Sequence, residues 1–356
     1  MDSASTRELQ DSLPQHFTLF ERDVSQLPLP ASFTYPFCYE PHPLSIVAAE
    51  ELQSYITMQT EWQHDFGDEK DHESFSVGKM FGVLVVKDAQ DRLGYLSAFS
   101  GKLADSNHHS RFVPPVFDML REGDFFLEGM KAFNVIQDEV KRLEANPDYQ
   151  CCLSKQRSDL KQGIEEVKTH KAKIKKEKAE RRILRNAAKL THTAANYKKL
   201  EADLAEESLQ GRVMLKRIRK YWNELNESNL ADLAVYKDEI DACKARRAAH
   251  SANLQRRLFD SYKFLNAKGE VATLNDIFKN LPSKAGAGEC AAPKLLHYAL
   301  KHKLKPIALA EFWWGSSPKN NERKHKAYYP ACKNKCRPIL EFMLEDFELF
   351  NTRNES

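Results

Sequence analysis

The longest regular pattern of apolar and polar positions lies in the middle third of the chain, from about Asp148 to Leu265. This stretch contains no proline and only two glycines, Gly163 and Gly211, and Ala, Leu, Lys, Glu, Gln and Arg dominate it. These residue types lose little side-chain freedom in a helix, and the preceding Asn146-Pro147-Asp148 is typical of a helix start. The pattern therefore predicts helix throughout the stretch.

Apolar residues in this stretch recur at alternating spacings of three and four, as in the seam between two packed helices. The first row comprises Leu153, Leu160, Val167 and Ile174, and the second, after Gly211, comprises Ile218, Trp222, Leu225, Tyr236, Ile240, Cys243, Leu254 and Leu258. A single helix of this length would leave its stripe exposed to water. We therefore predict an antiparallel hairpin that turns near Ser208–Gly211, each half on the order of 80 Å long.

The sequences on either side of this stretch mix strand and helix patterns. Residues 80–86 and 93–99 are two nearly continuous apolar runs joined by a polar segment, which predicts a β-hairpin buried on both faces. A helix is predicted over residues 45–63 with Ser45 as its N-cap, a strand over residues 306–315, and a closing helix over residues 339–350.

The predicted fold class is therefore α+β, in four parts. Residues 1–32 are expected to form a flexible lead-in and residues 33–130 an N-terminal α/β unit that contains the hairpin. Residues 131–265 are expected to form a long antiparallel helical, coiled-coil arm, and residues 266–356 a small C-terminal α/β unit.

Composition narrows the cellular setting. No run of 18 apolar residues occurs and the first residues are polar, which argues against a membrane span and a secretory signal. Seven cysteines, an odd number in a chain of 356 residues, argue against a disulfide framework. We therefore expect a cytoplasmic protein.

Charge is nearly balanced over the whole chain, with 54 Lys and Arg against 51 Asp and Glu, but it is uneven along the arm. Between Lys168 and Lys189 only two glutamates oppose a basic cluster made of Lys171, Lys173, Lys175, Lys176, Lys178, Arg181, Arg182 and Arg185. A local positive field attracts a polyanion, usually RNA or DNA, so these residues are predicted to bind nucleic acid. The alternative is an ordinary solvated helix face.

Three cysteines near predicted helix starts form a candidate zinc site. Cys290 opens one predicted helix, and Cys332 and Cys336 precede another, where helix N-termini favour the thiolate. Their order is similar to the zinc ligands of nucleobase deaminases. The deaminase pattern is not complete, because the last pair has C-x-x-x-C spacing and Ala292 stands where the proton-carrying glutamate belongs.

Two other interpretations of this region remain open. The cysteines are also typical of small buried residues, or Cys290 is a nucleophile with His297 or His302 as its base. Trp313 and Trp314 are candidates for base stacking, although core packing at the end of a strand is their commoner role.

Several stretches together resemble the N-terminal extension of a subgroup of bacterial RluA-type pseudouridine synthases. They are Phe37-Cys-Tyr-Glu-Pro-His-Pro-Leu44, Met80–Val86 with Gly94–Lys102, Gly286-Ala-Gly-Glu-Cys-Ala-Ala-Pro-Lys-Leu-Leu296, Ala310-Glu-Phe-Trp-Trp-Gly315 and Tyr329-Pro-Ala-Cys to Cys336. The resemblance runs from about Phe33 to Leu344. It implies a setting in uridine isomerisation of ribosomal or transfer RNA, with a catalytic synthase domain as partner.

The RluA-type catalytic motif contains Arg-Leu-Asp, which this chain lacks, and its nearest fragment is Arg92-Leu-Gly94. The resemblance therefore implies an accessory role in RNA engagement, with no catalytic residue carried over. The alternatives are a zinc-dependent, deaminase-like domain and a coiled-coil assembly protein.

Overall fold

The computed structural model describes residues 13–34, 36–37, 40–67, 78–279, 281, 286–318, 322–347 and 349–350. The chain divides into two compact units. Residues 1–128 and 253–356 make one, here called the sheet unit, and residues 129–252 make the other, here called the helical arm. The first twelve residues of the predicted lead-in lie outside the described part of the chain.

The sheet unit is built on a four-stranded antiparallel sheet of order β1-β4-β3-β7. Its strands are β1 (Thr18–Leu19), β3 (Lys79–Lys87), β4 (Leu93–Phe99) and β7 (Lys305–Trp314). The predicted hairpin is confirmed, since β3 and β4 pair antiparallel with Val83 opposite Ser97. The mixed α+β class is confirmed as well.

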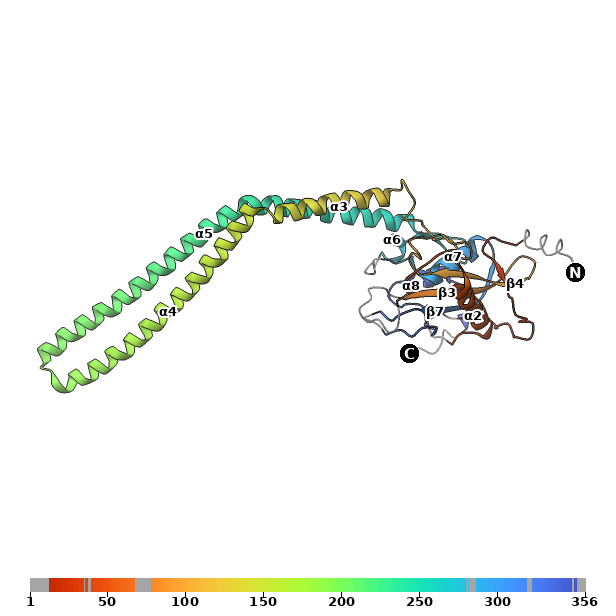
Figure 1. Cartoon of the computed structure of the whole chain (residues 1–356). Helices are drawn as coiled ribbons and strands as arrows, with labels where there is room; N and C mark the ends of the chain where they lie inside the picture. Colours follow the sequence, from red (N-terminus) through yellow and green to blue (C-terminus); the bar gives the residue numbers. More distant parts are fainter. Residues whose placement is uncertain are drawn as a thin grey trace. The chain divides into compact units, whose positions relative to one another are not determined.

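Helices cover both faces of this sheet, which explains why its strands are apolar at nearly every position. On one face, α2 (Pro43–Met58) packs against Phe81, Val83 and Val85. On the other, α7 (Ala291–Lys301) packs against β3 in the cluster that contains Leu84 and Val86, and α8 (Cys336–Met343) packs against α7 (Figure 1).

The two terminal segments share this one sheet, whereas the sequence predicted two separate units. Strand β7 pairs with β3 from Lys79 opposite Trp314 to Lys87 opposite Lys305. A buried strand must pair its backbone groups on both sides, and β3 finds its second partner more than 200 residues along the chain. The predicted lead-in also contributes, because Thr18–Leu19 pairs with β4 and Phe17 is buried.

Shorter elements complete the sheet unit. They are β2 (Phe33–Thr34), which pairs in parallel with β8 (Leu349–Phe350), the hairpin of β5 (Lys263–Leu265) and β6 (Val271–Thr273), and α6 (Leu274–Ile277). Two predicted boundaries were wrong. His42, and not Ser45, caps α2, since its Nδ1 accepts the N–H of Leu44 at 3.2 Å. The closing helix starts earlier than predicted, at Cys336, and ends at Met343.

The helical arm contains most of three helices, α3 (Phe125–Glu144), α4 (Pro147–Thr191) and α5 (Ala194–Ser261). Helices α4 and α5 run side by side and antiparallel (Figure 1). Polar pairs cross between them, with Gln156 Nε2 donating to Asn226 Oδ1 at 3.0 Å and Asn229 Nδ2 donating to Asp159 Oδ2 at 2.8 Å. The predicted long helical arm is confirmed.

The turn of the arm lies at His192 and Thr193, not at Ser208–Gly211 as predicted. The prediction placed the turn in the middle of the stretch because it took Asp148 as the start of the first half of the hairpin. In the structure α3 also packs along α5, where His250 Nε2 is 2.8 Å from the Gly129 carbonyl oxygen. The 20 residues of α3 and the 45 of α4 together match the 68 of α5.

None of the described helices combines the length and the apolar composition that a bilayer-spanning segment needs.

Candidate metal centre and nucleic-acid interface

Three cysteines from separate parts of the C-terminal segment converge in the sheet unit. Cys290 is the N-cap of α7, Cys336 is the first residue of α8, and Cys332 lies in the turn before it. Their Sγ atoms all lie within 4.8 Å of one another, and those of Cys332 and Cys336 are 3.3 Å apart. Helices α7 and α8 pack against each other, and their N-terminal cysteines lie close together. The cluster is able to hold a metal ion.

The cluster is arranged to carry negative charge on Cys332. Hydrogen bonds from the Cys290 and Cys336 thiols, and then from the backbone N–H groups of Cys336 and Lys335, lower the pKa of the Cys332 thiol well below its usual range. Hydrogen bonds among the same three thiols raise the pKa of Cys290 and of Cys336. A thiolate with two further thiols beside it is a donor set for a thiophilic metal ion.

A cavity of about 560 Å³ borders the three cysteines. Its other lining residues come from both pieces of the sheet unit and are Met80, Ser100, Gly101, Gly286, Glu289, Glu311, Trp313, Arg323, Pro330 and Lys335. Two carboxylates and two cations therefore share the cavity with the thiols.

Glu311 is a buried carboxylate that the sequence analysis missed. It is the one charged residue in the otherwise apolar β7 run from Pro306 to Trp314, which is the signal that identifies it. The residue is 4% exposed, and burial, with a smaller contribution from Cys332, raises the pKa of its carboxyl to about 7. Its Oε1 accepts the backbone N–H of Ala292 at 3.2 Å. A carboxylate from the neighbouring strand thus lies beside the position where a deaminase motif carries its glutamate.

The second carboxylate, Glu289, is bound by two buried side chains. It accepts a hydrogen bond from the Tyr262 hydroxyl, and its Oε2 is 3.2 Å from Lys294 Nζ. Lys294 is 2% exposed and also donates to the carbonyl oxygens of Phe99 and Gly101. This network fixes the loop that precedes Cys290.

The proposed bases for a cysteine nucleophile have other partners. His297 Nδ1 accepts the N–H of Leu265 at 3.3 Å, and burial lowers the pKa of this imidazole to about 4. The His302 ring stacks on Tyr298 with centroids 4.1 Å apart. Trp313 is 8% exposed and its Nε1 donates to the Ser316 carbonyl oxygen, which is a packing role.

In the arm, the eight predicted RNA-binding cations lie on α4, but they do not share one environment. Arg181 is 6% exposed and lies in the seam, where it pairs with Glu177 at 3.8 Å and Glu207 at 4.0 Å. Its guanidinium is therefore used inside the arm, whereas the sequence analysis predicted that it binds RNA. Lys173 and Lys176 are exposed and pair with Glu177 and Glu180 at 3.8 and 3.9 Å.

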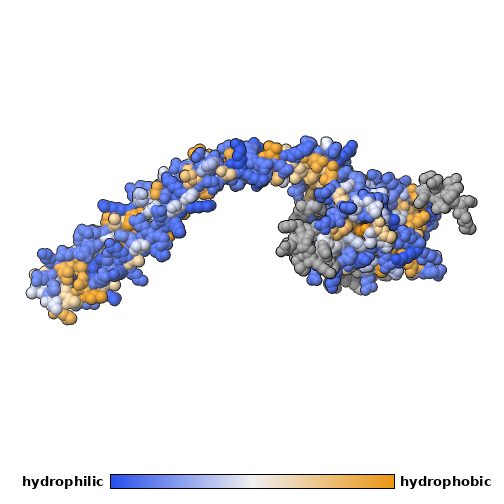
Figure 2. Space-filling model, viewed as in Figure 1, coloured by the Kyte–Doolittle hydropathy of each residue, from blue (hydrophilic) through white to orange (hydrophobic). Residues whose placement is uncertain are grey.

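The remaining five cations, with Lys189, form a continuous stripe. These six residues recur at spacings of four and three, so they lie on one side of the helix. We call this stripe the basic face; it consists of Lys171, Lys175, Lys178, Arg182, Arg185 and Lys189. Within the described part of the chain, none of the six forms an ion pair at 4.0 Å or less. Figure 2 shows most of the arm's visible surface as hydrophilic.

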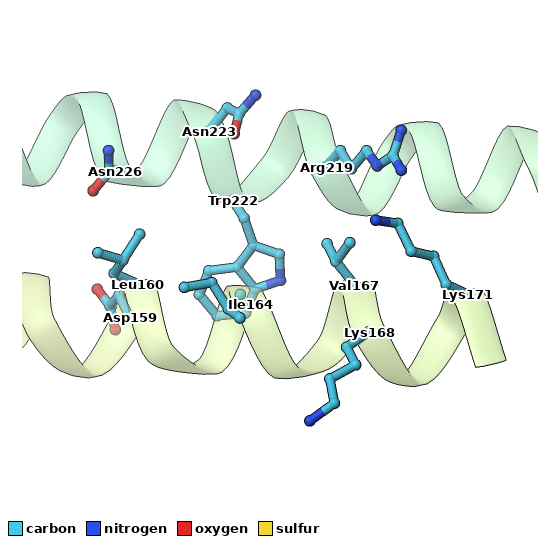
Figure 3. A pocket seen from close by; sticks show the side chains of 11 residues that line it. Asp159, Leu160, Ile164, Val167, Lys168, Lys171, Arg219, Trp222, Asn223 and Asn226 are labelled. Carbon is cyan, nitrogen blue, oxygen red and sulfur yellow. The ribbon is translucent and has the colours of Figure 1, made fainter. Parts of the chain in front are cut away.

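A hollow of about 560 Å³ lies between α4 and α5, and one cation of α5, Arg219, lies there beside Lys171 of the basic face (Figure 3). Trp222 of α5 reaches across to α4 there, and its Nε1 donates to Glu166 at 2.7 Å. Lys171 and Arg219 line the same hollow. Arg219 continues a three-and-four row with Arg212 and Lys216, a signal that the sequence analysis did not use.

Comparison of the chain with protein-family models, with curated proteins and with solved structures gives no match.

Proposed function

We propose that this protein is an RNA-binding accessory region of the RluA-type pseudouridine synthases, and that the basic face of the arm binds backbone phosphates of ribosomal or transfer RNA. The observation that carries the proposal is the alignment of six cations on one side of α4, none of them held in an ion pair among the described residues. The resemblance of the sequence supports the setting. A catalytic synthase domain is the expected partner.

The dimensions of the basic face suit a nucleic-acid backbone. From Lys171 to Lys189 the helix rises about 27 Å, so the six cations are spaced at intervals of roughly 5 Å. Exposed cations without a carboxylate partner can release the counterions of several phosphates at once, which is the main source of sequence-independent affinity. The near-neutral charge of the whole chain, +3, makes this field local to the arm.

The test compares two double variants on the same helix. Lys175→Gln with Lys178→Gln removes two cations of the basic face, and Lys173→Gln with Lys176→Gln removes two that already pair with glutamates. Titration of a structured transfer RNA transcript at several salt concentrations should show weaker binding for the first variant. The slope of log affinity against log salt should also fall by about 1 to 2, because each lost phosphate contact lowers it by somewhat less than one.

The second variant should bind the transcript nearly as well as the wild-type protein. Equal losses in the two variants would show that only net charge matters, and unchanged affinity in both would reject the basic face as an RNA site.

A second candidate function, a zinc centre similar in ligand order to that of nucleobase deaminases, is favoured by the convergence of three Sγ atoms within 4.8 Å. Zinc accepts thiolate ligands in a tetrahedral arrangement without redox chemistry. Its place between two helix N-termini, beside a cavity that contains the Glu311 carboxylate, supports a site for a small polar ligand.

Metal analysis tests this candidate. Protein prepared without chelators should contain about one zinc ion per chain, and Cys332→Ser should lose it, because two remaining thiols bind zinc far less tightly. Cys151→Ser is the matched control, since Cys151 is an exposed residue on α4 outside the cluster. Metal-free protein, or equal zinc loss in both variants, would contradict a zinc centre at this position.

A further inference from the structure

We propose that the three-cysteine cluster is an open metal site, in which a bound metal keeps its fourth coordination position for an exchangeable small ligand that also contacts Arg323. This inference rests on the proposed zinc centre. It adds the type of site and the class of ligand, namely water, hydroxide or a small anion.

The number of ligands among the described residues favours an open site. Structural zinc sites are closed by four protein ligands, whereas catalytic sites have three and keep one position for water or substrate. Across the part of the chain that the structure describes, Cys290, Cys332 and Cys336 are the members of the 4.8 Å cluster, and no histidine or carboxylate joins them. The described residues thus supply three ligands.

Neither neighbouring carboxylate is placed as the fourth ligand. Glu289 is held by Tyr262 and Lys294. Glu311 lies outside the 4.8 Å cluster and accepts the N–H of Ala292. Glu311 is instead suited to accept a hydrogen bond from a ligand on the metal, as outer partners of catalytic metals do.

The cavity gives such a ligand room. All three cysteines line the same space of about 560 Å³. A water molecule takes about 30 Å³ of liquid volume, so the cavity can hold a small molecule together with water. A metal bound by the cysteines therefore faces a space that a ligand can enter.

Arg323 supplies the second observation that points to a ligand. Its guanidinium lies 4.4 Å from the Tyr329 ring centroid and 5.6 Å from that of Trp313, so two aromatic rings hold it at the cavity wall. Its Nη1 atom is buried and has no hydrogen-bond partner among the described residues. A buried donor without an acceptor is costly. An anion or another acceptor on the metal would satisfy it.

The test replaces zinc with cobalt(II), whose visible spectrum reports the ligands around the metal. Azide, and ethanethiol as a softer probe, are titrated into the full chain loaded with cobalt. At least one of them should change the cobalt spectrum in a saturable way. Arg323→Gln should weaken azide binding roughly tenfold or more, as expected for loss of a charged hydrogen bond, with one cobalt still bound per chain.

Arg337→Gln is the matched control. It removes the same charge next to Cys336, but Arg337 Nε donates to Glu341 at 2.8 Å, and the residue does not line the cavity. It should leave azide affinity unchanged.

The outcomes separate the two proposals. Failure to bind one cobalt per chain would reject the zinc centre itself. One bound cobalt with a spectrum that ignores both probes would show a closed site and overturn the open-site inference. Equal azide affinity in Arg323→Gln and wild type would remove Arg323 from the site.

Discussion

Arg181 and Arg182 are adjacent in the sequence and have opposite environments. Arg181 is buried in the seam between Glu177 and Glu207, whereas Arg182 is exposed on the basic face. Successive residues of a helix differ by about 100° in direction, so each cation's role depends on its angle to the seam. A cluster of cations in a sequence is therefore a set of candidate RNA-binding residues, and the helix geometry decides which of them face solvent.

His297 gives a prediction at the residue scale. Burial lowers the pKa of its imidazole from 6.5 to about 4, so between these pH values the unfolded chain takes up a proton that the folded chain does not. Stability should therefore fall as pH decreases through this window, by about 3 kcal/mol at full effect. Above pH 6.5 the imidazole is neutral in both states and makes no such contribution.

The measurement is urea unfolding at pH 7 and pH 4.5. His297→Asn keeps an acceptor for the Leu265 N–H but does not titrate, so the variant should lose less stability on acidification than the wild type. An identical loss in both proteins would show that other groups cause the pH dependence.

At the scale of elements, the two glycines of the arm, Gly163 on α4 and Gly211 on α5, differ in the space around them. A Cβ atom on Gly163 would lie 2.8 Å from Cγ and Cδ2 of Trp222. At Gly211 the nearest atom would be Ile174 Cγ1 at 3.6 Å, an ordinary contact. Gly163 therefore permits a close approach of the helices at the indole, and Gly211 has no such role.

Alanine at these two positions should have opposite effects. Gly211→Ala should stabilise the arm by about 0.5 to 1 kcal/mol, because glycine is unfavourable inside a helix. Gly163→Ala should destabilise it by roughly 1 to 3 kcal/mol, since the methyl group overpacks the seam against a large, rigid side chain. Thermal unfolding followed by the helical circular dichroism signal measures both. Stabilisation by both substitutions would contradict the described packing at Trp222.

At the scale of the whole molecule, the chain returns after the arm to complete the fold in which it began. Strand β7 pairs with β3, and the cavity beside the three cysteines is lined by Met80, Ser100 and Gly101 from the first segment. The candidate metal centre thus belongs to the sheet unit and the basic face belongs to the arm. Each proposed function can be tested with substitutions that leave the other unit unchanged.

The sequence alone determined the local elements, since these follow from residue type and spacing. Three-and-four spacing identified the long arm, and two apolar runs with a polar connection identified the hairpin of β3 and β4. The cysteines at helix starts were also found as candidate ligands, because helix-start patterns are local.

Only the tertiary structure decided which distant segments meet. It placed β7 beside β3, brought Glu311 to the Ala292 N–H, and put Arg181 rather than Arg182 into the seam. It also moved the turn to His192 and Thr193, because α3 shares α5 with α4. Periodicity states which face of an element is apolar, but the partner of that face is fixed only when all the elements pack together.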